Sequence, residues 1–351
     1  MKINETPIRT SRNFKINNIN IEDVDFLEDV KNFQNVDIDY EDSSIKLSYS
    51  NDKILLEYGL GDFLQNELNE KSNVDLNIEV LNKEDKENKI LFNFDENNLK
   101  LVSKINIVAN KDTDSSFIIM LKSKESVKAY SNILVNIEAK ENSKVSVIVL
   151  NLLNNFSSNF LSINNTLYEN SKIDYKIIDF GGKYSITNYY SNLIGNDAFN
   201  DINTIYIGGR GQTFDLNYIT HLRGEKTSVN IDVQGALSED AKKNFKGTID
   251  FKKGCKKAVG NEEENCILLS NEAKGIALPM LLCSEEDVEG NHSTSAGKIN
   301  EKEMFYIMSR GFSKKEAEKL MVRARFNKVI ETIKDENLKE VILYEIDKRL
   351  D

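Results

Sequence analysis

The sequence predicts a mainly β protein, in which a β-helix core lies between a small irregular N-terminal region and a C-terminal helical subdomain. Three observations lead to this prediction. Residues 76–300 contain many runs in which apolar and polar residues alternate, as they do in half-buried strands. Polar turns recur along this stretch at a nearly constant interval. From residue 301 onward, apolar residues follow helical spacing instead.

Residues 1–75 mix short apolar patches with acidic runs and have no clear periodicity, so we expect a small mixed region. Its one distinct element is a short helix expected over Asp62–Leu68. Within residues 76–300 we expect strands rich in Ile, Val, Tyr and Thr, separated by Asn, Ser, Asp and Gly. Examples are Val145–Leu150, Ile173–Ile178 and Val229–Val233.

The turns between these strands form a repeat. Glu141-Asn-Ser-Lys-Val145 recurs as Glu169-Asn-Ser-Lys-Ile173, and looser versions begin at Asn196, Glu225 and Lys253, giving intervals of 28, 27, 29 and 28 residues. Such a period, with short strands and no helix inside it, is typical of stacked coils, and the small residue of each turn would stack on its neighbours. A sandwich or jelly roll with evenly spaced hairpins is the alternative. The absence of Asn-Gly and Asp-Gly from this zone weakens it.

Residues 301–351 are expected to form helices. Asn300 can cap the first, Gly311 can end it, and Ser313 with Glu316 forms a capping box for the second. A last helix is expected around Leu338–Ile346. This tail could cap the open end of the solenoid, or it could dock a partner.

Composition excludes several classes of protein. The 351 residues carry a net charge of −11, which argues against sequence-independent nucleic-acid binding. The 3 cysteines have no metal-knuckle or redox spacing, and no apolar stretch approaches the length of a membrane span. We therefore expect a cytoplasmic protein that binds neither nucleic acid nor membrane. The chain has only 2 prolines and is rich in asparagine. Asparagine can make turns in place of proline, or its abundance can reflect a biased genome.

Residues suited to catalysis are scarce, so we expect no enzyme activity. There is no Gly-x-Ser-x-Gly elbow, and Gly208-Gly-Arg-Gly-Gln-Thr213 lacks the lysine of a phosphate-binding loop, so a turn explains it better. Any ATP would have to be held by a partner. His221 lies in a strand pattern and is expected to be structural. His292 lies in a small, polar, loop-like segment, where it could bind a metal or simply be solvated.

Several unlinked segments together resemble the C-terminal signature of the SufB/SufD family of iron–sulfur cluster assembly proteins. They are Phe245–Ile249, Leu268–Ser270, Pro279–Leu282, Glu285–Gly297 (Glu-Glu-Asp-Val-Glu-Gly-Asn-His-Ser-Thr-Ser-Ala-Gly), Met304–Tyr306 and Ser309–Ala317. The resemblance is dense over residues 180–330. It implies a right-handed parallel β-helix with C-terminal helices that dock SufC, an ABC-type ATPase. It also implies pairing of SufB with SufD through their β-helices, in a complex with two SufC subunits.

Within this family the chain is most similar to SufD. SufB-like chains are longer and carry two cysteines and a glutamate where this chain has Glu264, Ala273 and Ser293. Cys266 lies two residues from the first of these positions, so a gap in the alignment could blur that difference. The resemblance makes His292 the candidate iron or cluster residue at the SufB interface. Cys283 is a weak second candidate that we expect instead to be buried as a small hydrophobe.

The resemblance also places SufC docking around Arg310, Gly311, Glu316 and Ala317. It implies a non-catalytic subunit with no resident cofactor, a transient iron–sulfur cluster in the complex, and ATP bound only through SufC. ATP-driven motion of SufC would pull on residues 310–330 and open the interface between the paralogues. Homodimers are possible. The alternatives are a SufB-like scaffold acting as a homodimer, a β-helix carbohydrate-active enzyme, or a structural interaction protein with an inert His292.

Overall fold

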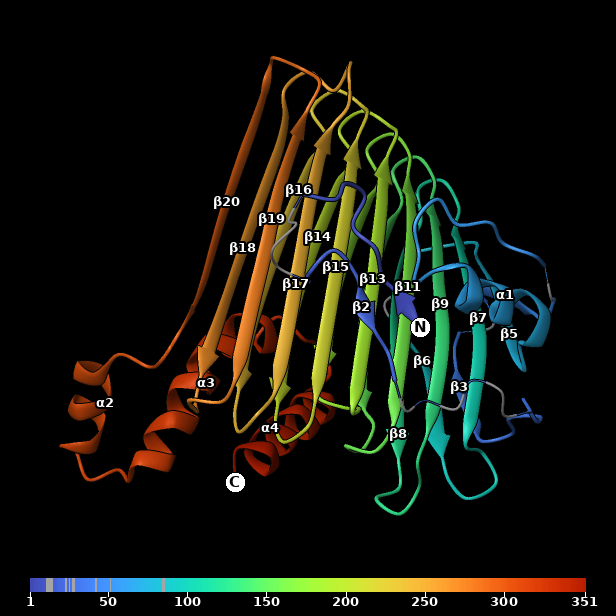
Figure 1. The fold of residues 1–351 in the computed structure, drawn as a ribbon. Coiled ribbons are helices and arrows are strands. Elements are labelled where there is room, and N and C mark those ends of the chain that lie inside the picture. The colour runs from blue at the N-terminus through green and yellow to red at the C-terminus, as the bar shows by residue number, and fades with distance from the viewer. Residues whose placement is uncertain are drawn as a thin grey trace.

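The computed structural model describes residues 1–10, 15–22, 24, 26, 29–41, 43–50, 52–83 and 86–351. The core is a parallel β-solenoid of about eight coils, flattened so that each coil contributes one strand to each of two facing sheets (Figure 1). The sequence-based prediction of a mainly β solenoid is confirmed. The hairpin-based sandwich is wrong, because neighbouring strands from β5 to β20 pair in parallel and in register.

One sheet, which we call the β20 sheet, has nine strands. In spatial order they are β20 (Val288–Gly297), β18 (Ala258–Leu268), β16 (Ser228–Leu237), β14 (Phe199–Gly208), β12 (Lys172–Asp179), β10 (Lys144–Leu152), β8 (Asp114–Ser123), β6 (Glu87–Phe94) and β3 (Val36–Asp39).

The facing sheet, which we call the β19 sheet, also has nine strands. They are β19 (Lys274–Cys283), β17 (Lys242–Phe251), β15 (Thr213–Leu222), β13 (Tyr184–Leu193), β11 (Ser158–Leu167), β9 (Tyr130–Ala139), β7 (Lys100–Ala109), β5 (Val74–Val80) and β4 (Ile45–Ser48). Strands β3 and β4 pair antiparallel with β6 and β5. They therefore cover the first coil, whereas the last coil ends on β19 and β20.

The repeating turns have the structural role that their spacing predicts. One residue in each of these turns adopts the left-handed conformation, with φ between 52° and 62°, namely Asp112, Asn142, Asn170, Asp197, Lys226 and Lys257. The side chain of Asn170 donates to Oδ1 of Asn142 at 2.8 Å, and Asn142 donates to Oδ1 of Asp112 at 2.8 Å. The small residue that follows is buried, and Ser143 and Ser171 each bond a carbonyl three residues back. Asparagine in these turns is therefore structural.

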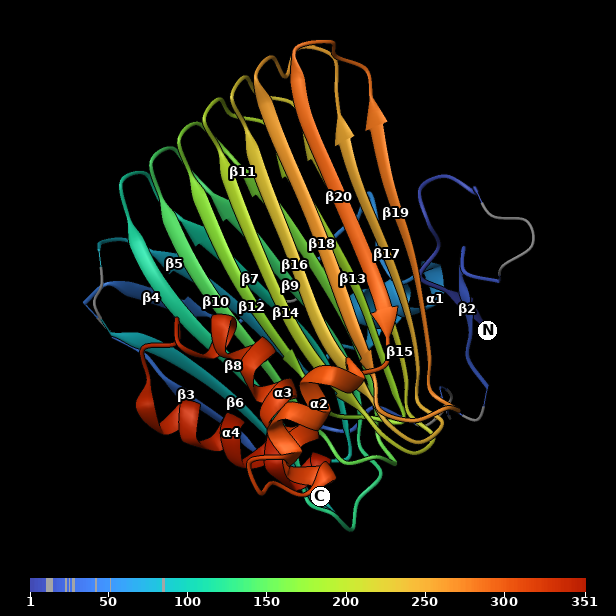
Figure 2. The same cartoon turned by 90° about the vertical axis from the view of Figure 1, so that its left-hand side faces the viewer.

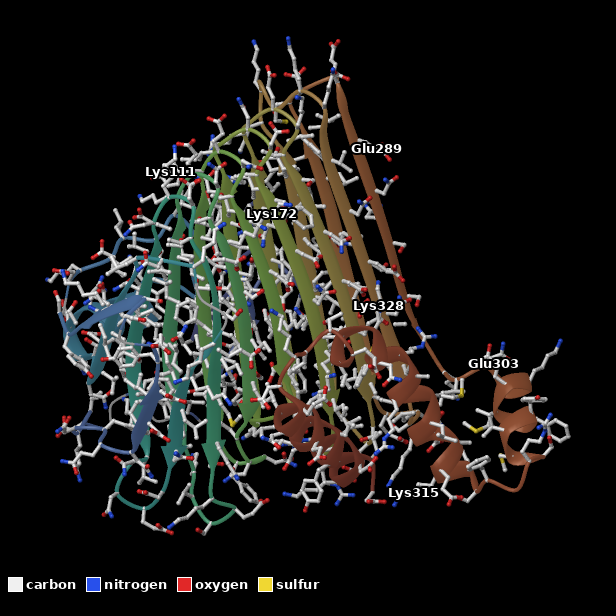
Figure 3. All side chains as sticks on the ribbon, turned by 180° about the vertical axis from the view of Figure 1, so that it is seen from behind. Lys111, Lys172, Glu289, Glu303, Lys315 and Lys328 are labelled. Atoms are coloured by element: carbon white, nitrogen blue, oxygen red, sulfur yellow. The ribbon has the colours of Figure 1, made fainter. Side chains whose placement is uncertain are left out.

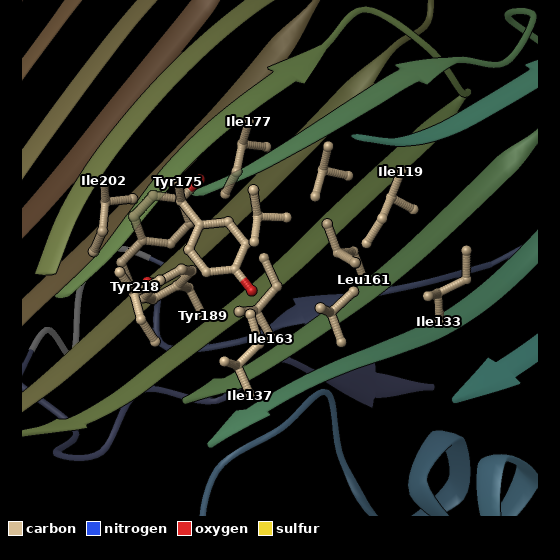
Figure 4. Packing of buried hydrophobic residues seen from close by; sticks show 14 of the residues in the cluster. Ile119, Ile133, Ile137, Leu161, Ile163, Tyr175, Ile177, Tyr189, Ile202 and Tyr218 are labelled. Carbon is tan, nitrogen blue, oxygen red and sulfur yellow. The ribbon is translucent and has the colours of Figure 1, made fainter. Parts of the chain in front are cut away.

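The space between the sheets is filled by apolar side chains through most of the solenoid (Figure 4). Aliphatic residues such as Ile133 and Ile163 give way to stacked aromatic rings toward the later coils. Tyr175 and Tyr189 meet edge to face at 5.2 Å, and Tyr189 and Tyr218 are 5.5 Å apart. Beyond these rings the apolar core continues through residues such as Phe245 and Phe251, but Lys243, Glu262 and Glu264 are also buried there.

The N-terminal region covers the outer face of the β19 sheet. It contains β1 (Lys2–Ile3) paired with β2 (Ile19–Asn20), and α1 (Asp62–Lys71), which confirms the helix expected over Asp62–Leu68. Leu64 and Leu68 pack against this face. Asn4 is fully buried and donates to Oδ1 of Asp215 at 2.7 Å.

The C-terminal helices are α2 (Glu301–Met308), α3 (Lys314–Ile330) and α4 (Glu336–Leu350). Helices α3 and α4 lie along the outer face of the β20 sheet (Figure 2). Phe326 and Ile342 are buried there against sheet residues such as Ile178 and Ile205. Of the two roles considered for the tail, capping of the open end does not hold for α3 and α4, because the outward positions of the β20 sheet are apolar and bury these helices instead. None of the helices in the described part of the chain is long and apolar enough to cross a membrane.

Candidate functional site

The solenoid ends on two strands whose outer edges pair with no strand of the described chain. Among the described residues, β20 pairs with β18 alone and β19 with β17 alone. Every residue of β20 after Val288 is exposed. An exposed strand edge is a template for a further strand, so this end is suited to binding another chain.

His292 lies in the middle of β20, on the face that looks into the space between the sheets. Its Cα partner in the register is Glu262 of β18. The buried positions of β18 alternate and include Glu262, Glu264 and Cys266, so these residues face inward and His292 shares their face. The expectation of a loop around His292 is wrong. Parallel pairing with β18 makes the segment a strand despite its small polar residues.

Glu262 lies one coil below His292, in the interior. Its side chain occupies the space left by Gly247 on the facing β17, where an added Cβ would lie 2.2 Å from Oε2 of Glu262. The residue is 3% exposed, and neither carboxylate oxygen has a hydrogen-bond partner among the described residues. Burial, and then the nearby Glu264 carboxylate, raise the pKa of Glu262 to about 8.

Glu264 is held in a small buried network. Its Oε1 accepts from Nζ of Lys243 at 2.6 Å and from the hydroxyl of Tyr206 at 3.3 Å. Burial raises the pKa of Glu264, and Lys243 opposes this rise. The interior of the last coils therefore holds two acidic side chains and one lysine in a column that ends at His292. We call Tyr206, Lys243, Glu262 and Glu264 the polar column.

The cysteines do not converge on His292. Cys283 ends β19, is exposed, and donates to the carbonyl of Glu285 at 2.9 Å, so the expectation of a buried Cys283 is wrong. Its coil is the last one, and nothing in the described chain stacks above it. Cys255 and Cys266 are buried, and burial raises the pKa of both thiols, that of Cys255 to about 11. No group of three or more metal-binding side chains occurs in the part of the chain that the structure describes.

The other histidine is structural. His221 is 2% exposed on the outer face of the β19 sheet, and its Nδ1 lies 3.2 Å from the hydroxyl of Tyr190. The ring of Tyr58, from the N-terminal region, packs edge-on against it at 5.5 Å. Burial lowers the pKa of His221 to about 4, so the imidazole is neutral near pH 7.

Helix α2 forms a second exposed feature. It buries none of its residues, and it stands away from the sheets beyond the end of β20 (Figure 1). Phe305 is 75% exposed and Tyr306 59%, and Met308 and Phe312 beside them are also exposed. Large apolar side chains gathered on a protruding helix are typical of a protein-binding site.

The four residues expected at the docking region differ in position. Arg310 is exposed and lies over the ring of Tyr306 at 4.9 Å. Gly311 adopts a φ of 98° in the turn after α2. Glu316 is engaged in the predicted capping box, where its Oε2 accepts from the backbone and hydroxyl of Ser313 at 2.7 Å. Ala317 is fully buried, so it shapes the packing of α3 and offers no surface to a partner.

Helix α3 is joined to the solenoid by polar as well as apolar contacts. Lys328 forms an ion pair with Asp232, which is almost fully buried on the outer face of β16. Figure 3 shows Lys328 on α3 close to the sheet, while Glu303 lies on α2 away from it. Helix α3 is thus attached to the β20 sheet by an ion pair as well as by apolar packing.

Sequence reasoning missed the importance of Glu262, Lys243 and Tyr206. A signal existed for Glu262, because the alternation of Asn261-Glu-Glu-Glu-Asn265 around a buried strand places the first and third glutamates on one face. The sequence does not show which face of β18 is buried or that Gly247 lies opposite Glu262. Both depend on contacts between strands far apart in sequence.

Comparisons with known proteins agree with this architecture. Residues 92–325 match the family model described as the SUF system FeS cluster assembly, SufBD core domain. The chain is 29% identical over 181 residues to the iron–sulfur cluster assembly protein SufD of Bacillus subtilis, an alignment that covers 51% of this chain and 41% of that protein.

Two further relatives are iron–sulfur cluster assembly SufBD family proteins. That of Staphylococcus saprophyticus is 26% identical over 47% of this chain and 35% of its own length. That of Staphylococcus aureus is 27% identical over 44% of this chain and 34% of its own length. The alignments thus cover less than half of these relatives. The family model, however, matches well over half of the chain and includes the last coils, α2 and most of α3, so the chain belongs to the SufBD family of SUF-system iron–sulfur cluster assembly proteins.

Proposed function

We propose that this chain is a SufD-like, non-catalytic subunit of a SUF assembly complex. In this proposal its open end pairs with a SufB-like paralogue, and its C-terminal helices dock a SufC-like ATPase. Iron and sulfide pass through as cargo, no cofactor resides in the chain, and ATP is bound only by the partner. The carrying observation is that His292 faces inward on a terminal strand whose outer edge pairs with no strand of the described chain. An imidazole placed there can meet thiolates supplied by a second chain. Cys255 and Cys266 of this chain are buried elsewhere, and burial raises the pKa of both thiols, so neither is suited to this role.

Pairing at the open end is tested by co-expression with the SufB-like and SufC-like proteins of the same cell. We expect His292→Ala to leave complex formation intact but to lower the cluster content of the anaerobically purified complex. Ser293→Ala is the matched control, because this exposed residue is adjacent and points to the opposite face of β20. Equal cluster content in both variants would remove His292 from the proposal.

Docking of the ATPase is tested by substitutions on α2. A deletion from residue 301 would expose the apolar outer face of the β20 sheet and is therefore a poor test. Phe305→Ala combined with Tyr306→Ala removes exposed side chains without opening the core, and we expect it to abolish co-purification of the ATPase. Tyr344→Ala on α4, where the tyrosine is 66% exposed, is the control. Retention of the ATPase by the α2 variant would show that docking lies elsewhere.

A homodimer is the main alternative for the open end, because a strand edge can also pair with a second copy of itself. The mass of the purified chain, measured by light scattering with and without the SufB-like protein, distinguishes the two. A dimer that persists in the presence of the paralogue would favour the SufB-like scaffold alternative. Membership in the SufBD family argues against a carbohydrate-active enzyme.

A further inference from the structure

We propose that Glu262 and His292 together form a binding site for a ferrous ion at the open end of the solenoid. The inference rests on the proposed function, since it names the cargo that this end would receive. It adds a second ligand, buried beneath His292, that no resemblance or motif indicates. The ion would be held by one carboxylate and one imidazole, and the remaining coordination positions would be left for water or for groups from the partner.

The first argument is that the carboxyl group of Glu262 lacks a bonding partner. Its carboxyl group is buried, and both of its oxygens are without a hydrogen-bond partner among the described residues. Leaving a buried polar group unsatisfied costs about 1–3 kcal/mol. A methionine or leucine would fill the gap above Gly247 without this cost, so packing alone does not explain a carboxyl group at this position.

The second argument concerns charge. Lys243 lies 2.6 Å from Oε1 of Glu264, so the ammonium group of the polar column is already matched by one carboxylate. Glu262 is the second acidic group of the column, and it forms no ion pair with any cationic side chain that the structure describes, so a metal ion would be its first charged partner. Lys243 also donates to the carbonyl of Ile276 on β19 at 3.3 Å, so its hydrogen bonds go to groups other than Glu262.

The third argument is position. Glu262 and His292 are partners in a parallel register, on the same face of adjacent strands. Adjacent strands lie about 4.8 Å apart, so two such side chains can close on one ion. Only the final coil separates Glu262 from solvent, and the residues that face inward beside His292 include the small Gly290 and Thr294. An ion from solution, or from a partner, can therefore reach the carboxylate.

The ligand chemistry selects a transition metal over calcium or magnesium. An imidazole with a carboxylate suits Fe²⁺, as in mononuclear iron sites that keep open positions, whereas Ca²⁺ and Mg²⁺ prefer oxygen ligands alone. Without thiolates the site holds iron less firmly than a cluster does. An ion held in this way can be passed on to the thiolates of a partner.

The test is anaerobic equilibrium dialysis of the full, tag-free chain against Fe²⁺, with Co²⁺ as a spectroscopic probe of the same site. We expect one saturable ion per chain and visible cobalt bands from bound nitrogen and oxygen ligands. Glu262→Gln keeps the volume of the side chain but removes a strong ligand, and it should weaken binding at least tenfold. His292→Asn should weaken binding to a similar extent and should also alter the cobalt spectrum.

Glu263→Gln is the matched control, because Glu263 is exposed on the opposite face of the same strand. It should bind iron as the unsubstituted chain does. Circular dichroism melting curves establish that each variant is folded. The inference is overturned if the unsubstituted chain binds no saturable ion, or if Glu262→Gln binds it as tightly as Glu263→Gln. These measurements need neither partner protein, so their failure is distinct from a failure to pair with SufB or to dock SufC.

Discussion

The carboxyl group of Glu262 occupies the space that any side chain at Gly247 would need. The two residues face each other across the solenoid interior, and a Cβ added to Gly247 would lie within 2.2–2.4 Å of all three carboxyl-group atoms of Glu262. A glycine on β17 thus allows a glutamate on β18. This complementarity links the packing of the last coils to the position of the carboxylate under His292.

Substituting Gly247 should therefore destabilise the fold. We expect Gly247→Ala to lower the free energy of unfolding by about 1–3 kcal/mol, as overpacking of a core does, when measured by urea denaturation. Gly297→Ala, where no atom lies within 4 Å of the added Cβ, should be neutral. In combination with Glu262→Ala the cost of Gly247→Ala should largely disappear. Additive effects of the two substitutions would contradict the direct contact.

Glu262 should make stability fall as the pH rises. The folded pKa of about 8 lies above the ordinary value of 4.5, so the folded state binds the proton more tightly than the unfolded state. The resulting stabilisation is complete below pH 4.5 and is lost as the pH approaches 8, at up to about 1.4 kcal/mol per pH unit. Glu262→Gln does not titrate, so its stability relative to the unsubstituted chain should rise between pH 5 and pH 8. Parallel pH profiles from chelator-treated samples would disprove this prediction.

His221 should have the opposite effect, so that stability falls as the pH is lowered. Its folded pKa of about 4 lies below the ordinary 6.5, first because of burial and then because of Lys252. The neutral ring stabilises the fold fully above pH 6.5, and this stabilisation is lost as the pH falls toward 4. We expect His221→Gln to have a flatter stability curve than the unsubstituted chain between pH 6.5 and pH 4. Urea titrations at several pH values measure both curves, and equal slopes would contradict the assignment.

The ion pair between Lys246 and Asp215 fastens the N-terminal region. The atoms Nζ and Oδ1 are 2.5 Å apart, both side chains are fully buried, and Lys246 also donates to the carbonyl of Asn4 at 2.7 Å. Lys246→Met leaves a buried carboxylate unpaired and should cost about 3–5 kcal/mol. Hydrogen exchange should also become faster in residues 1–8. Adding Asp215→Leu should restore most of the stability, and a double variant as unstable as Lys246→Met would show that the pair is not the cause.

The left-handed turn residues should respond to substitution according to side-chain type. Asn170→Ala removes the hydrogen bond to Asn142 and places alanine at a φ of 52°, so it should cost about 1–2 kcal/mol. Asn170→Gly should cost less. Lys226→Asn, at a φ of 57°, should stabilise the protein by several tenths of a kcal/mol, because asparagine tolerates this conformation better. Thermal melting should rank the three variants in stability as Lys226→Asn, then Asn170→Gly, then Asn170→Ala. The reverse ranking would contradict this prediction.

The solenoid could be predicted from the sequence because its signals are local. Alternation defines each strand, and the recurring turn defines each coil, as at Ser143 and Ser171. The placement of α3 and α4 on a sheet face was less accessible, although Val147-Ile-Val-Leu150 is apolar at successive positions and so indicates a strand that is buried on both faces. The N-terminal region could not be placed, because Asn4 meets Asp215 only through folding across more than 200 residues.

The site was only partly predictable. His292 was identified through resemblance to a family, while its inward orientation depends on the register with β18. Cys283 is expected to be buried because a free cysteine behaves as a small hydrophobe, but nothing in the described chain stacks above the last coil. In the sequence, nothing but its position in the alternation distinguishes Glu262 from the two glutamates that follow it. Its burial follows from the alternation of β18, and its environment is set by Gly247 and Lys243 on the facing strand.

The parallel, in-register stacking of the coils has a consequence for how this protein can vary. Successive side chains of β18 point to opposite sides, so deleting a single residue within that strand would exchange its two faces. Glu263 and Asn265 would turn inward, and Glu262 would point to solvent beneath a His292 left without its carboxylate. Insertions or deletions within the strands of the last coils should therefore disrupt the site, whereas a longer turn would leave the inward and outward faces of the strands unchanged. The alternation of inward and outward positions along β18, as much as the identity of its residues, determines which side chain lies beneath His292.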